Sequence, residues 1–268
     1  MVFQSFHFLL FFVVALIAVR VVFRNSFGSS KTFLLVASYY FYMCWDWRFA
    51  SLILAITAIN FVAGPRIHAA SDAATKKLWL AISLAASLGL LAYFKYANFF
   101  VDSFAGLLAA IGIQADIGLL HVVLPVGISF YTFQSISYVL DIYRGRVDPV
   151  ASFRDFALFV AFFPQLVAGP IVRASHFLPQ LKQGHRQEMD KPIESGIALM
   201  VRGFLKKIAI ADVLGVHYVD PAFSNPENFS SVFLIVALYA YSYQVYMVGP
   251  EICHKPSETL AQSGFPGC

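Results

Sequence analysis

The stretch that decides the fold is LPVGISFYTFQSISYVLDIYRG, residues 124–145. It is apolar enough to enter a bilayer, yet hydrogen-bonding side chains recur along it: Ser129, Thr132, Gln134, Ser135, Ser137 and Tyr138. In hydrocarbon each of these groups needs a protein or water partner, so the predicted helix faces protein or a wet cavity. The same side chain types also bridge packed membrane helices. Polarity alone leaves both interpretations open.

The composition places this helix in a polytopic membrane protein. Of the 268 residues, 59% are hydrophobic and 13% charged, and the mean hydropathy is +0.70. Soluble domains are about half apolar and about a quarter charged. The net charge of +4 does not indicate nucleic acid as a partner, because the basic residues fall between apolar runs, as in cytoplasmic membrane loops. The three cysteines have unrelated spacings and predict neither a disulfide framework nor a metal site.

The apolar runs predict an all-α fold, a polytopic transmembrane helical bundle with short, tilted and re-entrant segments. A membrane span needs about 20 mostly apolar residues. The sequence therefore predicts about eight membrane segments. The second and third apolar runs are short, and we expect them to form one tight hairpin or re-entrant unit. The runs cover residues 6–23, 33–45, 49–62, 78–94, 99–113, 117–140, 153–172, 193–214 and 232–248. Gly64–Pro65 is expected to end the hairpin, whose Trp45, Trp47 and tyrosines 39, 40 and 42 suit an interfacial aromatic belt.

The apolar run 153–172 is not expected to cross the membrane completely. If it crossed fully, the basic loop that contains Arg173 and Lys182 would lie outside, against the positive-inside rule. We therefore predict a re-entrant segment whose helix is broken at Pro164 and at Gly169–Pro170. Such breaks occur where protein or a cavity covers the freed backbone groups.

Charged residues within apolar runs are candidate sites, because burying a charge in hydrocarbon is costly. Arg202 and Lys206 are four residues apart and share a helix face, so they can bind the phosphates or carboxylate of an anionic substrate. Alternatively, they extend to lipid headgroups. Arg173 can hold an anion at a broken helix end or serve as a juxtamembrane cation. Asp141 and Arg144 are three apart and predict a local ion pair.

The histidines fit no catalytic motif on their own. Of the seven, His121 is the one expected at membrane depth. A lone histidine is more often structural than a general base. The sequence contains no Ser-His-Asp order, no metal-ligand spacing and no phosphate-cradling glycine loop.

Five stretches, in this order and spacing, resemble the membrane-bound O-acyltransferase family, in particular its branch of bacterial alginate O-acetylation proteins. They are SYYFYMCWDWRF (38–49), YFKYANFF (93–100), LPVGISFYTFQSISYVLDIYRG (124–145), FFPQLVAGPIVR (162–173) and RGFLKKIAIAD (202–212). The resemblance covers residues 1–246, a partial transmembrane domain of this kind. Residues 247–268 form a polar tail that does not match.

The resemblance implies acyl transfer within the bacterial inner membrane by a multi-pass protein. It implies an acyl donor, acetyl-CoA or similar, but no bound cofactor and no metal. Its partners would be membrane lipid and periplasmic polysaccharide-acetylation proteins. The candidate tunnel or substrate-contacting residues are Ser129, Gln134, Tyr138, Asp141, Arg144, Gln165, Arg173, Arg202 and Lys206.

The family's catalytic histidine, in a Trp-His-Gly motif, has no counterpart here, since no Trp-His pair occurs in the sequence. We therefore expect a shortened or frame-shifted member, or one half of a gene, that is inactive by itself. Two alternatives remain open. One is a transporter, because polar and broken membrane helices also build pathways. The other is a non-catalytic membrane scaffold for an acetylation complex.

Overall fold

The computed structural model describes residues 6–23, 26–111, 123–166, 172–183, 198, 201–203 and 205–248. The regular structure of these residues is helical throughout, which confirms the predicted all-α class. The chain divides into two compact units. One comprises Met1–Ala15 and Gly28–Pro179, and the other comprises Leu16–Phe27 and Gln180–Cys268.

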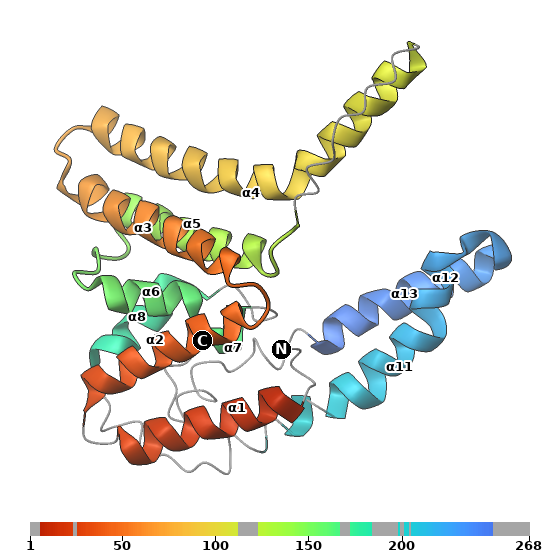
Figure 1. The fold of residues 1–268 in the computed structure, drawn as a ribbon, viewed down its shortest axis with the longest axis horizontal. Coiled ribbons are helices and arrows are strands. Elements are labelled where there is room, and N and C mark those ends of the chain that lie inside the picture. Colours follow the sequence, from red (N-terminus) through yellow and green to blue (C-terminus); the bar gives the residue numbers. More distant parts are fainter. Residues whose placement is uncertain are drawn as a thin grey trace. The chain divides into compact units, whose positions relative to one another are not determined.

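The first unit is a bundle in which α3, α4 and α5 pack against one another and α6 packs on α3 and α5 (Figure 1). Its elements are α1 (Phe6–Ile17), α2 (Phe27–Met43), α3 (Arg48–Ala69), α4 (Ala73–Ala110), α5 (Ile128–Tyr143), α6 (Phe153–Ala161), α7 (Phe163–Leu166) and α8 (Ala174–Gln183). The predicted first helix continues past α1 as a π-helical turn, η1 (Ala18–Val22).

The predicted short runs 33–45 and 49–62 form two helices, α2 and α3, joined by a short turn, but α3 does not end at Gly64–Pro65. It runs through Pro65 to Ala69, and both helices are longer than expected. Gly64 is buried against α5, where an added Cβ would lie 3.0 Å from Tyr138 and from Ile142. This dipeptide therefore permits close helix packing instead of ending a helix.

The two predicted runs 78–94 and 99–113 form one helix, α4, of 38 residues. Lys95 and Tyr96 were expected to separate them, but both are exposed within the helix, and the Lys95 ammonium lies 5.5 Å from the centre of the Tyr96 ring. At about 1.5 Å per residue, α4 is about 57 Å long, more than the hydrocarbon thickness of about 30 Å.

Residues 124–145, the stretch quoted first, form a helix framed by two glycines. Gly127, with φ of 76°, precedes the first residue of α5, and Gly145, with φ of 68°, follows its end. The Arg146 amide donates to the carbonyl of Asp141 at 2.8 Å, and the Gly145 amide donates to that of Ile142 at 2.9 Å. These two bonds form a Schellman motif, in which a left-handed glycine ends the helix. Residues 117–122 of the expected segment lie outside the described residues.

The run 153–172 is broken near Pro164, as predicted, but the break itself lies at Phe162, and Pro164 is within α7. The nine-residue α6 ends at Ala161, and the four-residue α7 begins at Phe163. The second expected break, at Gly169–Pro170, lies outside the described residues. After it, α8 packs back against α6, with the Phe177 ring centre 5.6 Å from that of Phe159. Helices of this length cannot cross a bilayer, so the re-entrant arrangement stays our interpretation.

The second unit packs α13 (Ser231–Val248) against an irregular helical stretch. That stretch comprises η2 (Lys207–Ala211), α11 (Asp212–Leu214), η3 (Gly215–Val219), α12 (Asp220–Ser224) and η4 (Pro226–Asn228). Gly215 lies against Gln244 of α13, whose Nε2 would be 2.8 Å from an added Cβ. The predicted run 232–248 is confirmed as α13, whereas the run 193–214 is only partly described.

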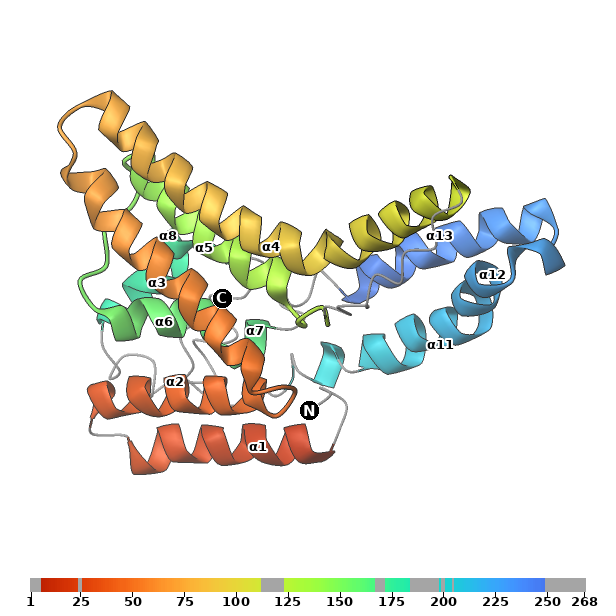
Figure 2. The ribbon, with the colours of Figure 1, turned by 45° about the horizontal axis from the view of Figure 1, so that its top comes forward.

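Within the part of the chain that the structure describes, two helices are long and apolar enough to cross a membrane, α3 with 22 residues and the part Ala73–Leu108 of α4 with 36. Within the first unit, α2 and α6 begin and α3 ends at the same end of the bundle (Figure 2). The basic residues Lys31, Arg66 and Arg154 fall in these turns. A gathering of cations at one end of apolar helices is typical of the cytoplasmic side.

Candidate functional site

The candidate site lies on the inner face of α5 in the first unit. Gln134, Tyr138 and Asp141 are buried there, with 4% of Gln134 and 7% of Asp141 exposed. Their spacing of four and three residues places them on one helix face. This face of α5 turns toward α6 and the connection before it, so α5 does not present these polar groups to lipid.

Gln134 contacts the end of α6. Its Nε2 donates to the carbonyl of Phe159 at 2.6 Å. On the other side of the helix break, the backbone amide of Phe163 donates to Ser38 Oγ of α2 at 3.2 Å. The α6–α7 break is therefore held between α5 and α2 by side chains.

Tyr138 fixes the start of the same segment. Its hydroxyl accepts from the Val150 amide at 3.1 Å, and its ring lies 4.4 Å from that of Phe156, centre to centre. Gly64 leaves room for this ring, because a Cβ there would crowd it. Tyr138 therefore joins α3, α5 and α6.

A second set of hydroxyls lies on α2 and α5. Tyr42 donates to the carbonyl of Val126 at 3.0 Å, and its ring meets that of Tyr131 edge-on at 6.2 Å. Among the described residues, the buried hydroxyls of Tyr131, Thr132 and Ser135 have no hydrogen-bond partner of good geometry. The predicted aromatic belt is thus wrong for Tyr42, which is buried, whereas Tyr40, Trp45 and Trp47 are exposed.

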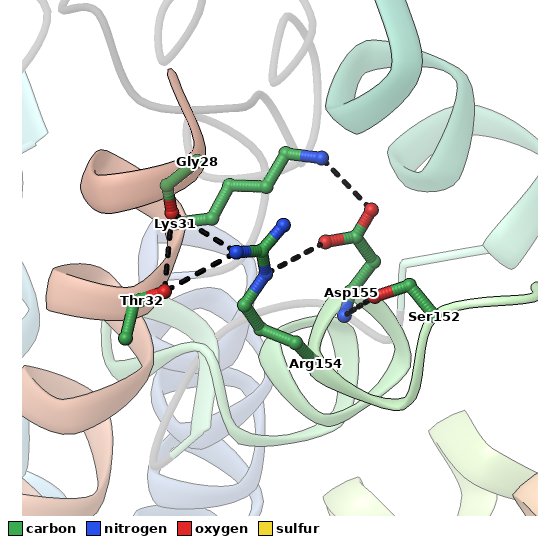
Figure 3. Close-up of polar contacts among 6 residues, drawn as sticks. All are labelled: Gly28, Lys31, Thr32, Ser152, Arg154 and Asp155. Atoms are coloured by element: carbon green, nitrogen blue, oxygen red, sulfur yellow. Dashed lines mark hydrogen bonds and ion pairs between the residues drawn. The ribbon is translucent and has the colours of Figure 1, made fainter. Parts of the chain in front are cut away.

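An ionic network joins the first turns of α2 and α6 (Figure 3). Lys31 Nζ lies 2.8 Å from Asp155 Oδ2, and Arg154 reaches the Gly28 carbonyl and the Thr32 hydroxyl at 3.2 and 3.3 Å. The Asp155 amide donates to Ser152 Oγ at 3.3 Å, the side-chain cap of α6. The network holds α6 at its first turn, and Gln134 holds it at the last.

The predicted ion pair between Asp141 and Arg144 is wrong in its partner. Arg144 is exposed, and Asp141 Oδ1 instead lies 3.9 Å from Arg146 Nη1. The reason is the left-handed Gly145, which turns the chain back after α5 and brings Arg146 beside Asp141. The sequence pattern assumed that the helix continues.

The other predicted residues of the first unit divide between interior and surface. Gln165 on α7 is buried with 3% exposed, and Ser129 is half-buried in the first turn of α5. Arg173 is exposed directly before α8, where its carbonyl accepts from the amides of His176 and Phe177. The structure thus brings Gln165 into the same interior as Gln134 and leaves Arg173 at the surface.

The predicted cationic pair belongs to the second unit. Arg202 is exposed and Lys206 half-buried, directly before the π-helical turn η2. The next residue, Lys207, pairs with Asp212 at 3.4 Å. His121 and the polar tail from residue 249 onward lie outside the described residues.

Sequence reasoning missed Ser38, Tyr42 and the Lys31–Asp155 pair. A signal was present for the first two, since they fall in the stretch SYYFYM, where polar atoms recur in an apolar run. No sequence signal joins Lys31 to Asp155, which is 124 residues away.

The buried hydroxyl and amide side chains of α2, α5 and α7 can orient other groups. They do not ionise near neutral pH, so they hold hydrogen-bonding groups in place without exchanging protons. Among the described residues, no group of three His, Cys, Asp or Glu side chains could hold a metal ion.

Comparisons with known proteins point to acyl transfer. Probable alginate O-acetylase AlgI of Pseudomonas aeruginosa is 40% identical over 214 residues, which are 80% of this chain and 40% of that protein. Its counterpart in Azotobacter vinelandii is 39% identical over 80% of this chain and 42% of its own length. Peptidoglycan O-acetyltransferase of Helicobacter pylori is 33% identical over 81% of this chain and 45% of its own length. No protein-family model matches the chain.

The chain spans less than half the length of these relatives. The relationship nonetheless extends over four-fifths of the chain, together with an all-helical fold that has two candidate spans. The chain is therefore a membrane protein and a homologue of the alginate O-acetylases, of the membrane-bound O-acyltransferase kind, over about two-fifths of their length.

Proposed function

We propose that this chain forms part of a bacterial inner-membrane O-acetylation machinery that transfers acetyl groups to alginate or a related exopolysaccharide. The observation that carries the proposal is the identity of about two in five residues, over 80% of the chain, to alginate O-acetylases. The buried cluster of α2, α5, α6 and α7 supports it, because hydroxyl and amide groups held inside an apolar bundle suit the wall of a path for a polar substrate.

In this proposal the acyl donor, acetyl-CoA or similar, enters from the end of the first unit where Lys31, Arg66 and Arg154 gather. A phosphate-rich donor is attracted by cations at the membrane surface. Tyr138 and Gln165 line its further path. In the second unit, Arg202 and Lys206 are separate candidates for an anion contact. Membrane lipid and periplasmic acetylation proteins are the proposed partners.

The general base that such a reaction needs is, in our proposal, not on this chain. Near neutral pH a histidine is the usual group for taking a proton from an acceptor hydroxyl. The sequence contains no Trp-His pair, and the relatives extend well beyond the part that this chain matches. We therefore propose that the 268-residue chain alone does not transfer acetyl groups.

A chimaera tests the proposal. The segment of the Pseudomonas aeruginosa relative that aligns with this chain is replaced by the corresponding residues of the chain, and the acetyl content of secreted alginate is measured in cells lacking the native protein. Acetylation by the chimaera, but not by the chain alone, is the expected result. A chimaera that inserts normally and fails to acetylate would count against the shared function.

Acetyl transfer by the purified chain alone would instead contradict the missing base.

A further inference from the structure

The break between α6 and α7 removes one particular backbone hydrogen bond. Phe162, with φ of −59° and ψ of 111°, leaves the helical conformation. In a continuous α-helix the amide of Phe163 would donate to the carbonyl of Phe159, four residues earlier. Both residues are fully buried. Because an unpaired backbone group in an apolar interior is costly, each of the two groups needs a new partner.

Two side chains from two different helices supply those partners. Gln134 of α5 donates to the freed Phe159 carbonyl at 2.6 Å, and Ser38 of α2 accepts from the freed Phe163 amide at 3.2 Å. The hydroxyl proton of Ser38 goes to the carbonyl of Leu34 at 2.7 Å, which turns a lone pair toward the amide. The backbone bond between Phe163 and Phe159 is thus replaced by two side-chain bonds.

Pro164 weakens the continuous helix as an alternative, although a proline alone does not exclude it, since α3 continues through Pro65. Pro164 has no amide proton to give to Val160, and its ring would crowd the carbonyl of that residue. A helix re-formed without the two side chains would therefore be kinked and would still lack that bond. The geometry of the break depends on what Ser38 and Gln134 hold.

We infer that Ser38 and Gln134 are positioning residues that together fix the α7 turn, and with it Gln165, in the interior of the first unit. Beyond the break, the amides of Gln165 and Leu166 both donate to the carbonyl of Phe162, at 3.0 and 3.1 Å. The turn is therefore tied to the break itself. That Gln165 then faces the transferred group rests on the proposed function; that the turn is held by these two side chains does not.

General helix packing is the competing explanation. Ser, Thr and Gln often bridge membrane helices, and their loss then weakens the whole bundle slightly. A positioning role predicts a local effect instead, confined to the chain around Phe162. The two explanations therefore differ in where the backbone opens.

Hydrogen–deuterium exchange of the full chain in lipid nanodiscs separates them. The variants are S38A, which removes the acceptor, and Q134M, which keeps the volume of the side chain but removes the donor. S38T retains the hydroxyl. The matched control is S137A, because Ser137 lies on the same helix as Gln134 but bonds only to that helix, with Oγ 2.7 Å from the Gln134 carbonyl oxygen.

We expect S38A and Q134M to speed exchange of the amides of Phe163, Gln165 and Leu166 by about tenfold or more, since an opened backbone bond exposes its amide. Exchange in α3 should stay unchanged, and S38T and S137A should resemble the unsubstituted chain. Unchanged exchange of these three amides, or equal acceleration in all helices, would overturn the inference.

The catalytic consequence is measured separately in the chimaera. In the chimaera, S38A and Q134M should lower kcat for acetyl transfer roughly tenfold, and KM for acetyl-CoA should change less than that. The reason is that a misplaced turn affects the alignment of the reacting groups more than substrate binding. An inactive unsubstituted chimaera would refute the proposed function and leave the exchange result intact. Equal loss through KM would contradict the positioning role.

Discussion

Lys31 and Asp155 form an ion pair with 2.8 Å between Nζ and Oδ2, and only 9% and 13% of their side chains are exposed. The pair joins the first turn of α2 to the first turn of α6. Seven residues after Lys31, Ser38 contacts Phe163, eight residues after Asp155. The two helices thus run side by side in the same direction, joined by charge at the start and by a hydrogen bond near the end.

Breaking this ion pair from one side should destabilise the first unit more than removing both charges. K31M leaves the Asp155 carboxylate almost buried with Arg154, 3.5 Å away, as its remaining cation, at an expected cost of up to about 3 kcal/mol. The double variant K31M/D155L should lose less than either single change. Thermal unfolding in detergent measures the difference.

The control for that experiment is the pair Lys207–Asp212, whose side chains are 35% and 42% exposed. K207M should change the unfolding free energy by less than about 1 kcal/mol, because water screens exposed pairs. If K31M were equally mild, the Lys31–Asp155 pair would contribute no more than a surface contact.

Gly64 should not tolerate a methyl group. In G64A the new Cβ would lie 3.0 Å from the Tyr138 and Ile142 side chains, so these buried side chains must move by a few tenths of an ångström. Overpacking of this kind costs about 1–3 kcal/mol. The shift should also lengthen the hydrogen bond from Val150 to Tyr138.

Matched glycines make the test of Gly64 specific. An added Cβ at Gly89 or Gly106 of α4 meets nothing within 4 Å. G89A and G106A should therefore raise stability by up to about 1 kcal/mol through helix propensity alone. A G64A variant that behaves like these two would show that α3 and α5 are not in close contact.

Sequence patterns predicted the features that depend on single glycines and prolines near helix ends. Gly127 and Gly145 frame α5 because each adopts a left-handed conformation that other residues avoid. The break at Phe162 lies two residues before Pro164, which lacks the amide proton for a bond to Val160. The helices α2 and α3 followed from two apolar runs separated by a short polar turn.

The sequence was misleading where a local signal has a tertiary meaning. Gly64–Pro65 resembles a helix stop, but the contact with α5 makes the glycine a packing site within α3. Lys95 resembles the end of a span, but a lysine exposed on a long helix interrupts nothing. The partners of the freed backbone groups at Phe162 could not be predicted, because Ser38 is 125 residues from Phe163.

Asn60 is expected to be the main polar contact between α3 and α4. Its Nδ2 donates to Ser87 Oγ at 3.0 Å, and its Oδ1 accepts from Ser83 Oγ at 2.8 Å, all of them fully buried. N60L should cost about 0.6–1.7 kcal/mol, the range of such bonds in membrane bundles. S51A, which removes an exposed hydroxyl bonded within its own helix, is the control.

A double-mutant cycle between N60L and S83A/S87A measures the coupling of this network. The combined loss should be smaller than the sum of the two separate losses, because both changes remove the same bonds. Additive losses would show that Asn60 and the serines act independently.

Asp72 should make stability depend on pH at the start of α4. Its Oδ2 accepts from the Thr75 amide at 2.7 Å, and this backbone hydrogen bond holds the pKa of the Asp72 carboxyl below its ordinary value. A carboxyl whose pKa is lower in the folded state stabilises the protein above the unfolded pKa, about 3.9. That contribution is lost as the pH falls through the folded pKa.

D72N keeps a capping side chain but cannot ionise, so its unfolding midpoint should fall less steeply below about pH 4 than that of the unsubstituted chain. Parallel pH profiles for the two proteins would show that the cap does not favour the ionised form.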